Sequence, residues 1–517
     1  MITQVPEWYN ASVIVDRNLE AGREDNVAIC YGDEQITYGE LARRVNRFGH
    51  ALKELGVGRE NRVLLVLNDT PSFPVAFFAA MRIGAVPVPV NTLLGADDYR
   101  YFVEDSLART VVVDGEHHEK VRDALDGFEK PVELILTNNG REEGVRTLED
   151  LLEWGEDELT PADTHKDDAA FWLYSSGTTG NPKGVVHLHH DIDYTCETYA
   201  RHVLEVDESD RMFSTTKLFH AYGFGNGISF PYWAGASSVL LPGRPTPEAV
   251  LQTIQQYEPT LFFCVPTLYR SILDYEEAED YDLSSIRLCV SASEPLPADI
   301  WHRWEDTFGL TILDGIGTTE MLHIFVSNYP DEVKPGSSGK AVPGYEVRIL
   351  DEEGYSLEAG DAGYLQIKGD SALAYYWRNH EETKETVKGE WLHAGDWYRL
   401  DEDGFYWYEG RADDMIKVSG LWVSPLDVEN TLNEHEAVSE TAAVGIPVDG
   451  LNQVKAFVIL SEGYEGSEDL AEEIQEWSED KLKGHQQPQM IEFVEELPRN
   501  PMGKLQRKKL REAESWS

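Results

Sequence analysis

The strongest constraint on the fold of this 517-residue chain is an alternation of helix and strand patterns up to about residue 330. In TYGELARRVNRFGHALKELG (37–56), apolar residues recur on one helical face, and Thr37 with Glu40 forms a capping-box pattern. The strand RVLLVL (62–67), the helix FPVAFFAAMRIGA and the strand VPVPV follow. Helices that alternate with buried strands predict a layered α/β fold with largely parallel strands.

The alternation resumes at residue 169 with the strand AAFWLYSS and the helix DIDYTCETYARHVL. From SGKAVPGYEVRIL onward, short strands separated by turns predict a β-rich subdomain over about 331–412. A boundary near GRADDMIKVSG precedes a compact α+β segment. We therefore expect a large N-terminal domain over 1–412, with two layered α/β subdomains and the β-rich part, and a small C-terminal domain over 413–517.

The formal net charge is −50, from 94 acidic and 44 basic residues, while 41% of the residues are apolar. That apolar content is enough for a folded protein. Acidic residues spread along the whole chain predict a surface adapted to high salt, and hence a halophilic source. Such charge disfavours binding to nucleic acid and to anionic membranes.

The four cysteines are far apart in apolar segments and have no metal-binding spacing, which predicts buried free thiols in a reducing cytoplasm: Cys30, Cys196, Cys264 and Cys289. The N-terminal residues lack the pattern of a signal peptide, so we expect a cytoplasmic protein. The uncharged segment 218–243 is interrupted by glycines, prolines, His220 and Asn226. We expect a buried strand and turn that line a pocket there, and no membrane insertion.

Residues 174–184 read YSSGTTGNPKG, which predicts a phosphate-binding loop or, alternatively, a polar surface loop. Glycines expose backbone amides, and the hydroxyls and Lys183 add further donors to phosphate oxygens. The string is not a P-loop of the usual NTPase type, because Pro182 precedes the lysine and Gly184 occupies the position of the magnesium-binding hydroxyl. A metal ion must therefore be held elsewhere.

The loop resembles the phosphate-loop signature of the adenylate-forming superfamily, which comprises acyl-CoA synthetases, luciferases and peptide-synthetase adenylation domains. The family's other motifs follow in order as DGIGTTEM (314–321), HAGDWY (393–398), GRADD (410–414) and LPRNPMGKLQRKKLR (497–511). Singly these strings are also typical of a helix start, two turns and a solvated basic helix face. Their order identifies the chain as a member of the superfamily, whose small C-terminal domain is mobile.

The resemblance implies that Thr319 contacts phosphate, that Glu320 binds Mg²⁺, and that Asp396 with Arg411 binds the ribose of ATP. The implied cofactor-binding residues are Ser175, Ser176, Gly177, Thr178, Thr179, Lys183, Asp314, Gly315, Thr319, Asp396, Arg411 and Gly420. The implied catalytic residues are Lys504, His220, Lys417 and Glu320, the last also being the metal ligand. Ile316 stands where the family commonly has an aromatic residue, which leaves the surface that stacks on adenine open.

By resemblance the reaction has two steps. A carboxylate attacks the α-phosphate of MgATP, giving an acyl-AMP and pyrophosphate, while Lys504 bridges the carboxylate and the α-phosphate. The thiol of coenzyme A then attacks the acyl carbon and expels AMP. The C-terminal domain rotates between the steps about a hinge at Asp413, and Lys417 and Gly420 then face the site.

The strings KLFHAYGFGNG, DGIGTTEMLHIFVSN and GDSALAYYWRN most resemble the benzoate-CoA ligase branch, which implies an aromatic acid substrate. The implied substrate pocket is lined by Ala221, Tyr222, Gly315, His323 and Ile324. The chain departs from the branch at His220, where a phenylalanine is usual, and at Ser293, where a glycine is usual. Both changes favour a hydroxylated or aminated ring, although His220 is alternatively a structural histidine.

Three alternatives stay open. One is a ligase for short- or medium-chain or arylpropenoic acids, and another is a stand-alone adenylation enzyme that loads aryl groups onto a carrier protein. A regulatory ATP-binding protein without turnover is the third, and the presence of Lys504, Glu320 and Asp396 argues against it. The sequence does not decide whether the chain forms a homodimer.

Overall fold

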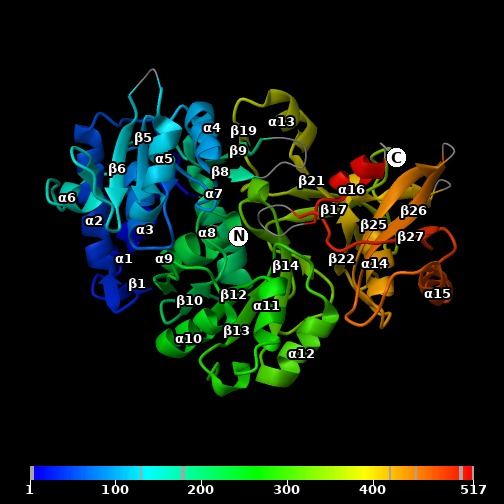
Figure 1. The fold of residues 1–517 in the computed structure, drawn as a ribbon. Helices are drawn as coiled ribbons and strands as arrows, with labels where there is room; N and C mark the ends of the chain where they lie inside the picture. The colour runs from blue at the N-terminus through cyan, green and yellow to red at the C-terminus, as the bar shows by residue number, and fades with distance from the viewer. Residues whose placement is uncertain are drawn as a thin grey trace. The chain divides into compact units, whose positions relative to one another are not determined.

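A computed structural model of the chain describes residues 5–128, 131–175, 181–418, 421–448, 451–499 and 505–514. The chain divides into two compact units (Figure 1). The first comprises Met1–Val347 and Ile367–Leu392, and the second comprises Arg348–Gln366 and His393–Ser517.

The first unit begins with a parallel sheet in the strand order β4-β3-β5-β6-β7. Its strands are β3 (Arg62–Val66), β4 (Val86–Pro89), β5 (Thr110–Asp114), β6 (Glu133–Thr137) and β7 (Arg146–Thr147). The helices of this part are α1 (Val13–Glu20), α2 (Tyr38–Glu54), α3 (Ser72–Arg82), α4 (Ala96–Ser106), α5 (His118–Leu125) and α6 (Leu148–Leu151). The predicted alternation is confirmed here, and so is the predicted cap of α2, since the Thr37 hydroxyl accepts from the Glu40 amide at 3.2 Å.

A second sheet has the strand order β16-β15-β14-β13-β12-β10-β11-β1-β2. Its strands are β1 (Val27–Tyr31), β2 (Glu34–Thr37), β10 (Arg211–Ser214), β11 (Ser237–Val239), β12 (Leu261–Cys264), β13 (Leu288–Ser291), β14 (Ile312–Gly317), β15 (Ile324–Ser327) and β16 (Lys340–Ala341). Its central strands pair in parallel, and β2, β15 and β16 add antiparallel pairs at its two ends. Helices α10 (Pro247–Tyr257), α11 (Pro266–Leu273) and α12 (Ala298–Phe308) lie beside this sheet in Figure 1.

A third, smaller sheet in the order β19-β9-β8 carries the start and end of the glycine-rich loop. Its strands are β8 (Ala169–Ser175), β9 (Lys183–Leu188) and β19 (Tyr375–Tyr376), all paired antiparallel. Helix α7 (His189–Thr195) follows β9, and α13 (His380–Thr386) follows β19. The sheet therefore brings chain from near residue 375 beside the loop strands.

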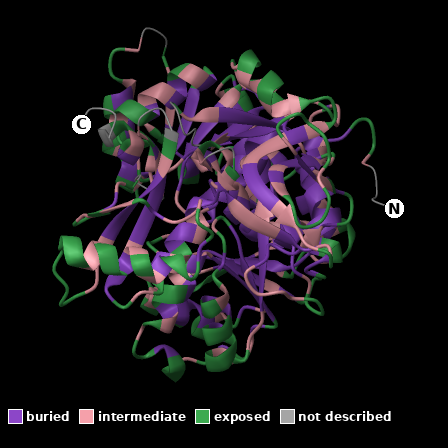
Figure 2. Cartoon of the chain, turned by 90° about the vertical axis from the view of Figure 1, so that its right-hand side faces the viewer, coloured by how far each residue is buried: buried purple, intermediate pink, exposed green. Residues whose placement is uncertain are grey.

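Strands of the first unit are largely buried, and the helices that cover them carry exposed residues on their outer faces (Figure 2). One core cluster packs beneath α10, α11 and α12, with Trp304 and Tyr269 in contact at 4.7 Å between ring centroids. Another packs around β3, β4 and β5. These cores fix the sheet edges that carry the candidate site.

The prediction of strand and turn over 218–243 is wrong for most of that segment. It forms α8 (Ala221–Phe224), a π-helical turn (Gly225–Ser229) and α9 (Phe230–Ala234), and only β11 is a strand. Phe224 packs against Phe77 and Phe171, each at 5.0 Å between ring centroids. This sequence is rich in glycine, which disfavours helix locally. It is helical nevertheless, because it is buried on all sides.

A further sheet has the order β17-β18-β21-β20, with β22 beside β21; β20 belongs to the first unit, β22 belongs to the second, and the unit boundaries fall within β17, β18 and β21. The strands are β17 (Glu346–Leu350), β18 (Ala362–Lys368), β20 (Val387–Lys388), β21 (Trp391–Leu400) and β22 (Tyr406–Arg411). Further along are the hairpin β23 (Ile416–Val418) and β24 (Leu421–Val423), and the sheet β25 (Val438–Val448), β26 (Leu451–Leu460) and β27 (Met490–Phe493). The helices are α14 (Pro425–Asn433), α15 (Glu468–Glu479) and α16 (Arg507–Glu514).

Residues 348–366 and 393–412 thus group with the C-terminal residues, whereas the sequence predicted them in the N-terminal domain. The two compact units describe one arrangement of the chain and do not identify the hinge about which a domain would rotate. The domain boundary at residue 413 therefore stays a prediction. The four cysteines are buried free thiols, as predicted. Among the described residues, no helix combines the length and the hydropathy that a membrane-spanning helix needs.

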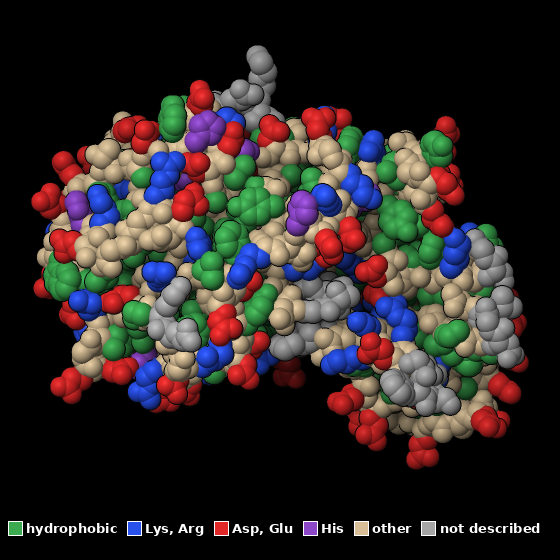
Figure 3. All heavy atoms as spheres, turned by 90° about the horizontal axis from the view of Figure 1, so that it is seen from above, with side chains coloured by type: hydrophobic (Ala, Val, Ile, Leu, Met, Phe, Trp, Pro, Cys, Tyr) green, Lys and Arg blue, Asp and Glu red, His purple; other side chains and the backbone are tan. Residues whose placement is uncertain are grey.

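Acidic side chains are distributed over the face shown in Figure 3 and are interspersed with fewer basic ones. A net charge of −50 opposes compaction through repulsion, which added salt screens over distances of about 10 Å at 0.1 M and 3 Å at 1 M. We therefore expect the unfolding temperature, measured by circular dichroism, to rise when KCl increases from 50 mM to 1 M. An equimolar series with an uncharged osmolyte controls for solvent effects, and equal unfolding temperatures across the KCl series would contradict the prediction.

Candidate active site

The carboxyl ends of β12, β13 and β14 meet at one edge of the second sheet. Cys264, Ser291 and Asp314 are register partners along this edge. Ligands of parallel α/β sheets bind outside such ends, where loops carry polar groups that the sheet does not use. Burial raises the pKa of Asp314 well above its ordinary value, and its backbone carbonyl accepts from the Asn328 amide at 2.9 Å.

The predicted phosphate and metal motif follows β14 directly. Thr319–Met321 form a short 3₁₀ helix, and the hydroxyl of Thr318 caps it by accepting from the Met321 amide at 3.1 Å. Oε1 of Glu320 accepts from the hydroxyl of Tyr376 at 2.8 Å. Within the described ranges Oε2 of Glu320 has no hydrogen-bond or ion-pair partner. One carboxylate oxygen is thus fixed, and the other faces no described protein group.

Tyr376 also connects Glu320 to the glycine-rich loop. Nζ of Lys183 lies 5.2 Å from the centre of the Tyr376 ring and forms an ion pair with Glu382 at 2.5 Å. Ser175 is the register partner of Lys183 across β8 and β9. Burial, followed by the charge of Glu320, raises the pKa of Tyr376, so its phenol keeps the proton that it donates. The structure therefore brings Ser175, Lys183 and Glu320 into one neighbourhood.

The predicted substrate pocket is built from α8 and the strand β15. The rings of Tyr222 and His323 lie 5.7 Å apart, and the hydroxyl of Tyr222 donates to the Val290 carbonyl at 3.1 Å. Gly225 is required beside them, because a Cβ there would lie 2.2 Å from Cδ2 of His323. Across the hairpin, a Cβ on Gly315 would lie 3.0 Å from Cγ2 of Ile324. Four of the five predicted pocket residues are thus linked by contacts.

Polar atoms in this pocket lack partners. His323 is 3% exposed, and neither of its ring nitrogens makes a hydrogen bond to a described side chain. Burial lowers the pKa of His323 to about 3, so the ring is neutral at pH 7. Buried polar atoms without partners are costly, which is typical of a site that binds a polar ligand.

His220 caps the N-terminus of α8, next to Ala221. Its ring packs on that of Phe219 with centroids 4.6 Å apart. Burial lowers the pKa of His220 to about 4, so this ring is also neutral at pH 7. Ser293 has a φ of 78°, a left-handed conformation that favours glycine. The glycine usual in the resembled branch would relieve that strain.

In the second unit, Asp396 and Arg411 are register partners on β21 and β22. Nη1 of Arg411 lies 2.9 Å from Oδ1 of Asp396, and the carboxylate is 6% exposed. The adjacent Gly395 has a φ of 71°, and a Cβ there would lie 2.9 Å from the Arg411 guanidinium. Asp396 and Arg411 thus form an ion pair that the hairpin holds, and their role in ribose binding stays a prediction.

Asp413 lies in the short helix Ala412–Asp414, where its carbonyl accepts from Arg511 at 3.3 Å. Nζ of Lys417 pairs with Glu352 at 2.5 Å and lies over the Trp422 ring. The remaining predicted site residues lie outside the described residues: Ser176, Gly177, Thr178, Thr179, Gly420 and Lys504.

Metal ligation among the described residues is sparse. No group of three or more His, Cys, Asp or Glu side chains in these ranges is arranged to hold a metal ion. Mg²⁺ is normally bound by one or two carboxylates together with substrate phosphates and water. Glu320, with one oxygen held by Tyr376 and the other turned to no described group, fits such a ligand.

The sequence analysis missed residues that hold the motif from elsewhere in the chain. Tyr376 is one of them. Its segment, GDSALAYYWRN, indicated only a resemblance to the benzoate-CoA ligase branch and no role for the tyrosine. His187 is another, because its Nε2 contacts the Thr319 carbonyl at 2.8 Å. No local pattern shows contacts over such sequence separations.

Comparison with known proteins agrees with this geometry. The family profile described as AMP-binding enzyme matches residues 15–377, and the one described as AMP-binding enzyme C-terminal domain matches residues 427–504. The benzoate–CoA ligase of Thauera aromatica is 45% identical over 99% of this chain and 97% of its own length. The 4-hydroxybenzoate–CoA/benzoate–CoA ligase of Rhodopseudomonas palustris is 41% identical over 98% and 94%.

A crystal structure of an anthranilate CoA ligase in complex with anthranoyl-AMP superposes with a TM-score of 0.91 at 40% identity. The match covers 99% of this chain and 98% of that one. The predicted fold class, a large α/β N-terminal part with a small C-terminal domain, is confirmed. With both profiles matched and full-length relatives above 40% identity, the chain belongs to the AMP-binding enzyme family, as its motifs had indicated.

Proposed function

We propose that the protein is an AMP-forming aryl-CoA ligase that activates benzoate or a substituted benzoate with ATP and transfers the acyl group to coenzyme A. The observation that carries the proposal is the environment of His323 in the predicted acid pocket, where aromatic rings surround a buried imidazole whose nitrogens make no hydrogen bond to a described side chain. A flat acid with a ring substituent would fill such a pocket and meet those atoms. The benzoate and hydroxybenzoate ligases among the relatives support this substrate class.

ATP binds with its phosphates at the glycine-rich loop and at Thr319, and Glu320 holds the Mg²⁺ ion that neutralises phosphate charge. Tyr376 keeps Glu320 oriented through its 2.8 Å hydrogen bond. Asp396 accepts hydrogen bonds from the ribose hydroxyls, and Arg411 keeps this carboxylate in place.

In the first step an oxygen of the aryl carboxylate attacks the α-phosphate and pyrophosphate leaves. Lys504 bridges the two anionic groups and lowers their repulsion. His220, neutral at pH 7, closes the pocket over the carboxylate without adding charge. In the second step the coenzyme A thiol attacks the acyl carbon and AMP leaves, with Lys417 and Gly420 lining the site after rotation about Asp413.

Two features of the proposal concern the surroundings of the enzyme. The acidic surface supports a halophilic source, because a chain of charge −50 is best screened at high salt. We infer that the protein works in the cytoplasm, since its substrates ATP and coenzyme A are cytoplasmic metabolites. The oligomeric state, including a homodimer, is measurable by light scattering in molar KCl.

A test of the function measures pyrophosphate release in molar KCl over benzoate, hydroxybenzoates, aminobenzoate, cinnamate and C2 to C8 acids. We expect the largest kcat/KM with a benzoate, together with formation of its CoA thioester. Release that is unaffected by CoA but increases with a carrier protein would indicate an adenylation enzyme. The absence of release with every acid would contradict the proposal.

Lys504→Ala separates the two steps. We expect it to lower adenylate formation by at least about a hundredfold, the scale of losing one charge-stabilising group, while preformed acyl-AMP still reacts with CoA. Lys508→Ala is the matched control, because it removes an exposed cation of the same segment that forms an ion pair with Glu512 on its own helix. Equal loss of both steps in Lys504→Ala would contradict the assignment.

Tyr376→Phe tests whether the hydrogen bond from the Tyr376 hydroxyl orients the Glu320 carboxylate. Removing a hydrogen bond to a charged group should weaken Mg²⁺-dependent ATP binding by about tenfold, measured as the Mg²⁺ concentration that gives half-maximal adenylation. Tyr329→Phe is the control, since it loses a 3.0 Å hydrogen bond to the Ala341 carbonyl away from the motif. If the two variants respond alike, Tyr376 does not orient Glu320.

A further inference from the structure

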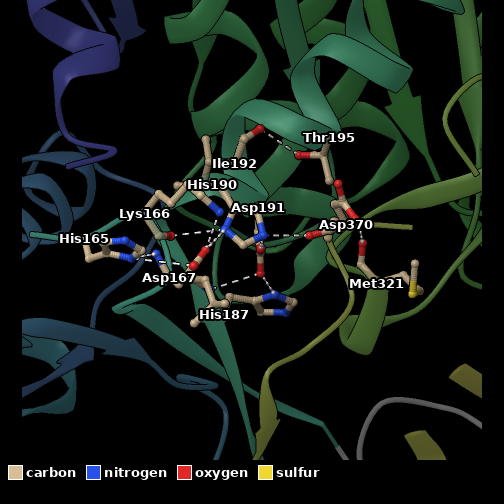
Figure 4. Close-up of polar contacts among 12 residues, drawn as sticks. His165, Lys166, Asp167, His187, His190, Asp191, Ile192, Thr195, Met321 and Asp370 are labelled. Atoms are coloured by element: carbon tan, nitrogen blue, oxygen red, sulfur yellow. Dashed lines mark hydrogen bonds and ion pairs between the residues drawn. The ribbon is translucent and has the colours of Figure 1, made fainter. Parts of the chain in front are cut away.

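Behind the phosphate motif, buried His187, partly buried His190 and an aspartate between them form a polar cluster that the reaction does not use (Figure 4). His187 lies on β9, and His190 and Asp191 lie on the first turn of α7. The side chains of His187 and Asp191 are 0% exposed, and that of His190 is 20% exposed. All three belong to the first unit.

His187 connects this cluster to the motif. Its Nε2 lies 2.8 Å from the Thr319 carbonyl oxygen, and its Nδ1 lies 2.8 Å from Oδ2 of Asp191. A carbonyl oxygen has no hydrogen to give, so Nε2 must be the donor. Phe171 stacks on the imidazole at 5.3 Å with an interplanar angle of 22°, which fixes the ring plane.

Asp191 is fixed in turn. Its Oδ2 also accepts from the Leu188 amide at 3.0 Å, and its Oδ1 lies 3.2 Å from Nε2 of His190. The two ring nitrogens of His190 face the carbonyls of Lys166 and Asp370, at 3.1 and 2.9 Å. Each ring nitrogen of His190 therefore faces a carbonyl oxygen, which places the ring between the two turns.

The cluster thus ties three segments together: the turn near Lys166, the turn near Asp370 and the motif at Thr319. The turn near Asp370 leads directly to Leu373, whose amide donates to the Glu320 carbonyl at 2.7 Å. Ser371 donates to the Met321 carbonyl at 2.9 Å. Consecutive carbonyls of the short 3₁₀ helix, at Thr319, Glu320 and Met321, are therefore all held from this side.

We propose that His187, fixed by Asp191, is a positioning residue that sets the orientation of the Thr319–Glu320 backbone for MgATP. The inference rests on the proposed function for the identity of the ligand. The carbonyls of this short helix accept hydrogen bonds on one side. The side chains on the opposite side therefore have little conformational freedom. Loss of the Nε2 donor would leave the Thr319 carbonyl with only the Leu322 amide, at 3.1 Å within the same short helix, and would let the motif shift relative to β9.

Two substitutions of His187 separate positioning from packing. The amide nitrogen of glutamine reaches the place of Nε2, so His187→Gln keeps a donor to the Thr319 carbonyl. The amide of asparagine reaches only the place of Nδ1, so His187→Asn keeps the contact with Asp191 and loses the one with Thr319. His50→Asn is the matched control, since its Nε2 contacts the Glu158 carbonyl at 2.9 Å on the surface.

The primary readout is the rise in unfolding temperature that ATP causes, titrated with Mg²⁺, which needs no turnover. We expect His187→Asn to raise the half-saturating Mg²⁺ concentration by about tenfold, and His187→Gln and His50→Asn to stay within about threefold of the wild type. In kinetics, His187→Asn should slow adenylation and leave the reaction of preformed acyl-AMP with CoA unchanged.

Equal Mg²⁺ titrations for His187→Asn and His187→Gln would overturn the proposal, as would equal slowing of both half-reactions. Should His187→Asn not fold, Asp191→Asn replaces it, because this change keeps the shape of the side chain and removes the charge that orients His187. An unchanged titration in Asp191→Asn overturns the proposal as well. A wild type that is stabilised by MgATP but releases no pyrophosphate with any acid would refute the proposed function while the positioning test stays valid.

Discussion

The candidate site depends on one change of pairing within β14. Ile312–Asp314 belong to the parallel part of the sheet, whereas Gly315–Gly317 pair antiparallel with β15. The change brings the returning strand so close that a Cβ on Gly315 would lie 2.8 Å from the Val326 carbonyl, and one on Gly317 would lie 2.6 Å from the His323 carbonyl. Only glycine fits at both positions. The same hairpin carries Glu320 at its turn and His323 at the start of its return, so a single backbone feature places residues of both the predicted phosphate motif and the predicted acid pocket.

Much of the fold follows from local sequence signals, and the site follows only in part. Alternating apolar patterns predict the parallel sheets correctly, because strand and helix periodicity are local properties. Local patterns fail to predict the helices of segment 218–243. These helices are stabilised by packing against Phe77 and Phe171, which are distant in sequence. Motif resemblance located Glu320 and Asp396, but the groups that hold the Glu320 motif, Tyr376 and His187, lie 56 and 132 residues from their partners. Such contacts arise from topology and not from any pattern along the chain.

Buried polar groups divide this molecule into supporting and receiving parts. In the supporting part, the ring nitrogens of His187 and His190 face carbonyl or carboxylate oxygens, which links β9 and α7 to the Thr319 carbonyl. In the receiving part, the ring nitrogens of His323 make no hydrogen bond to a described side chain. Hydrogen-bonded groups stabilise a fold, whereas a buried polar atom without a partner costs stability that a complementary ligand restores on binding. This contrast between two histidine environments is a reason for the proposal that His323 contacts the substrate.

A chain of charge −50 must still attract ATP and coenzyme A, which are themselves anionic. Each described cation of the predicted site is paired with a carboxylate, as Lys183 is with Glu382, Arg411 with Asp396, and Lys417 with Glu352. Exposed pairs such as Lys417–Glu352 contribute little stability and weaken further in salt, whereas the largely buried Asp396 is screened less. High ionic strength would thus reduce the long-range repulsion of the ligands and loosen the exposed lysine pair, while leaving intact the ion pair of Asp396, which we propose as the ribose-binding residue. An acidic surface is compatible with the binding of anionic ligands because salt screens exposed charges strongly and buried charges weakly.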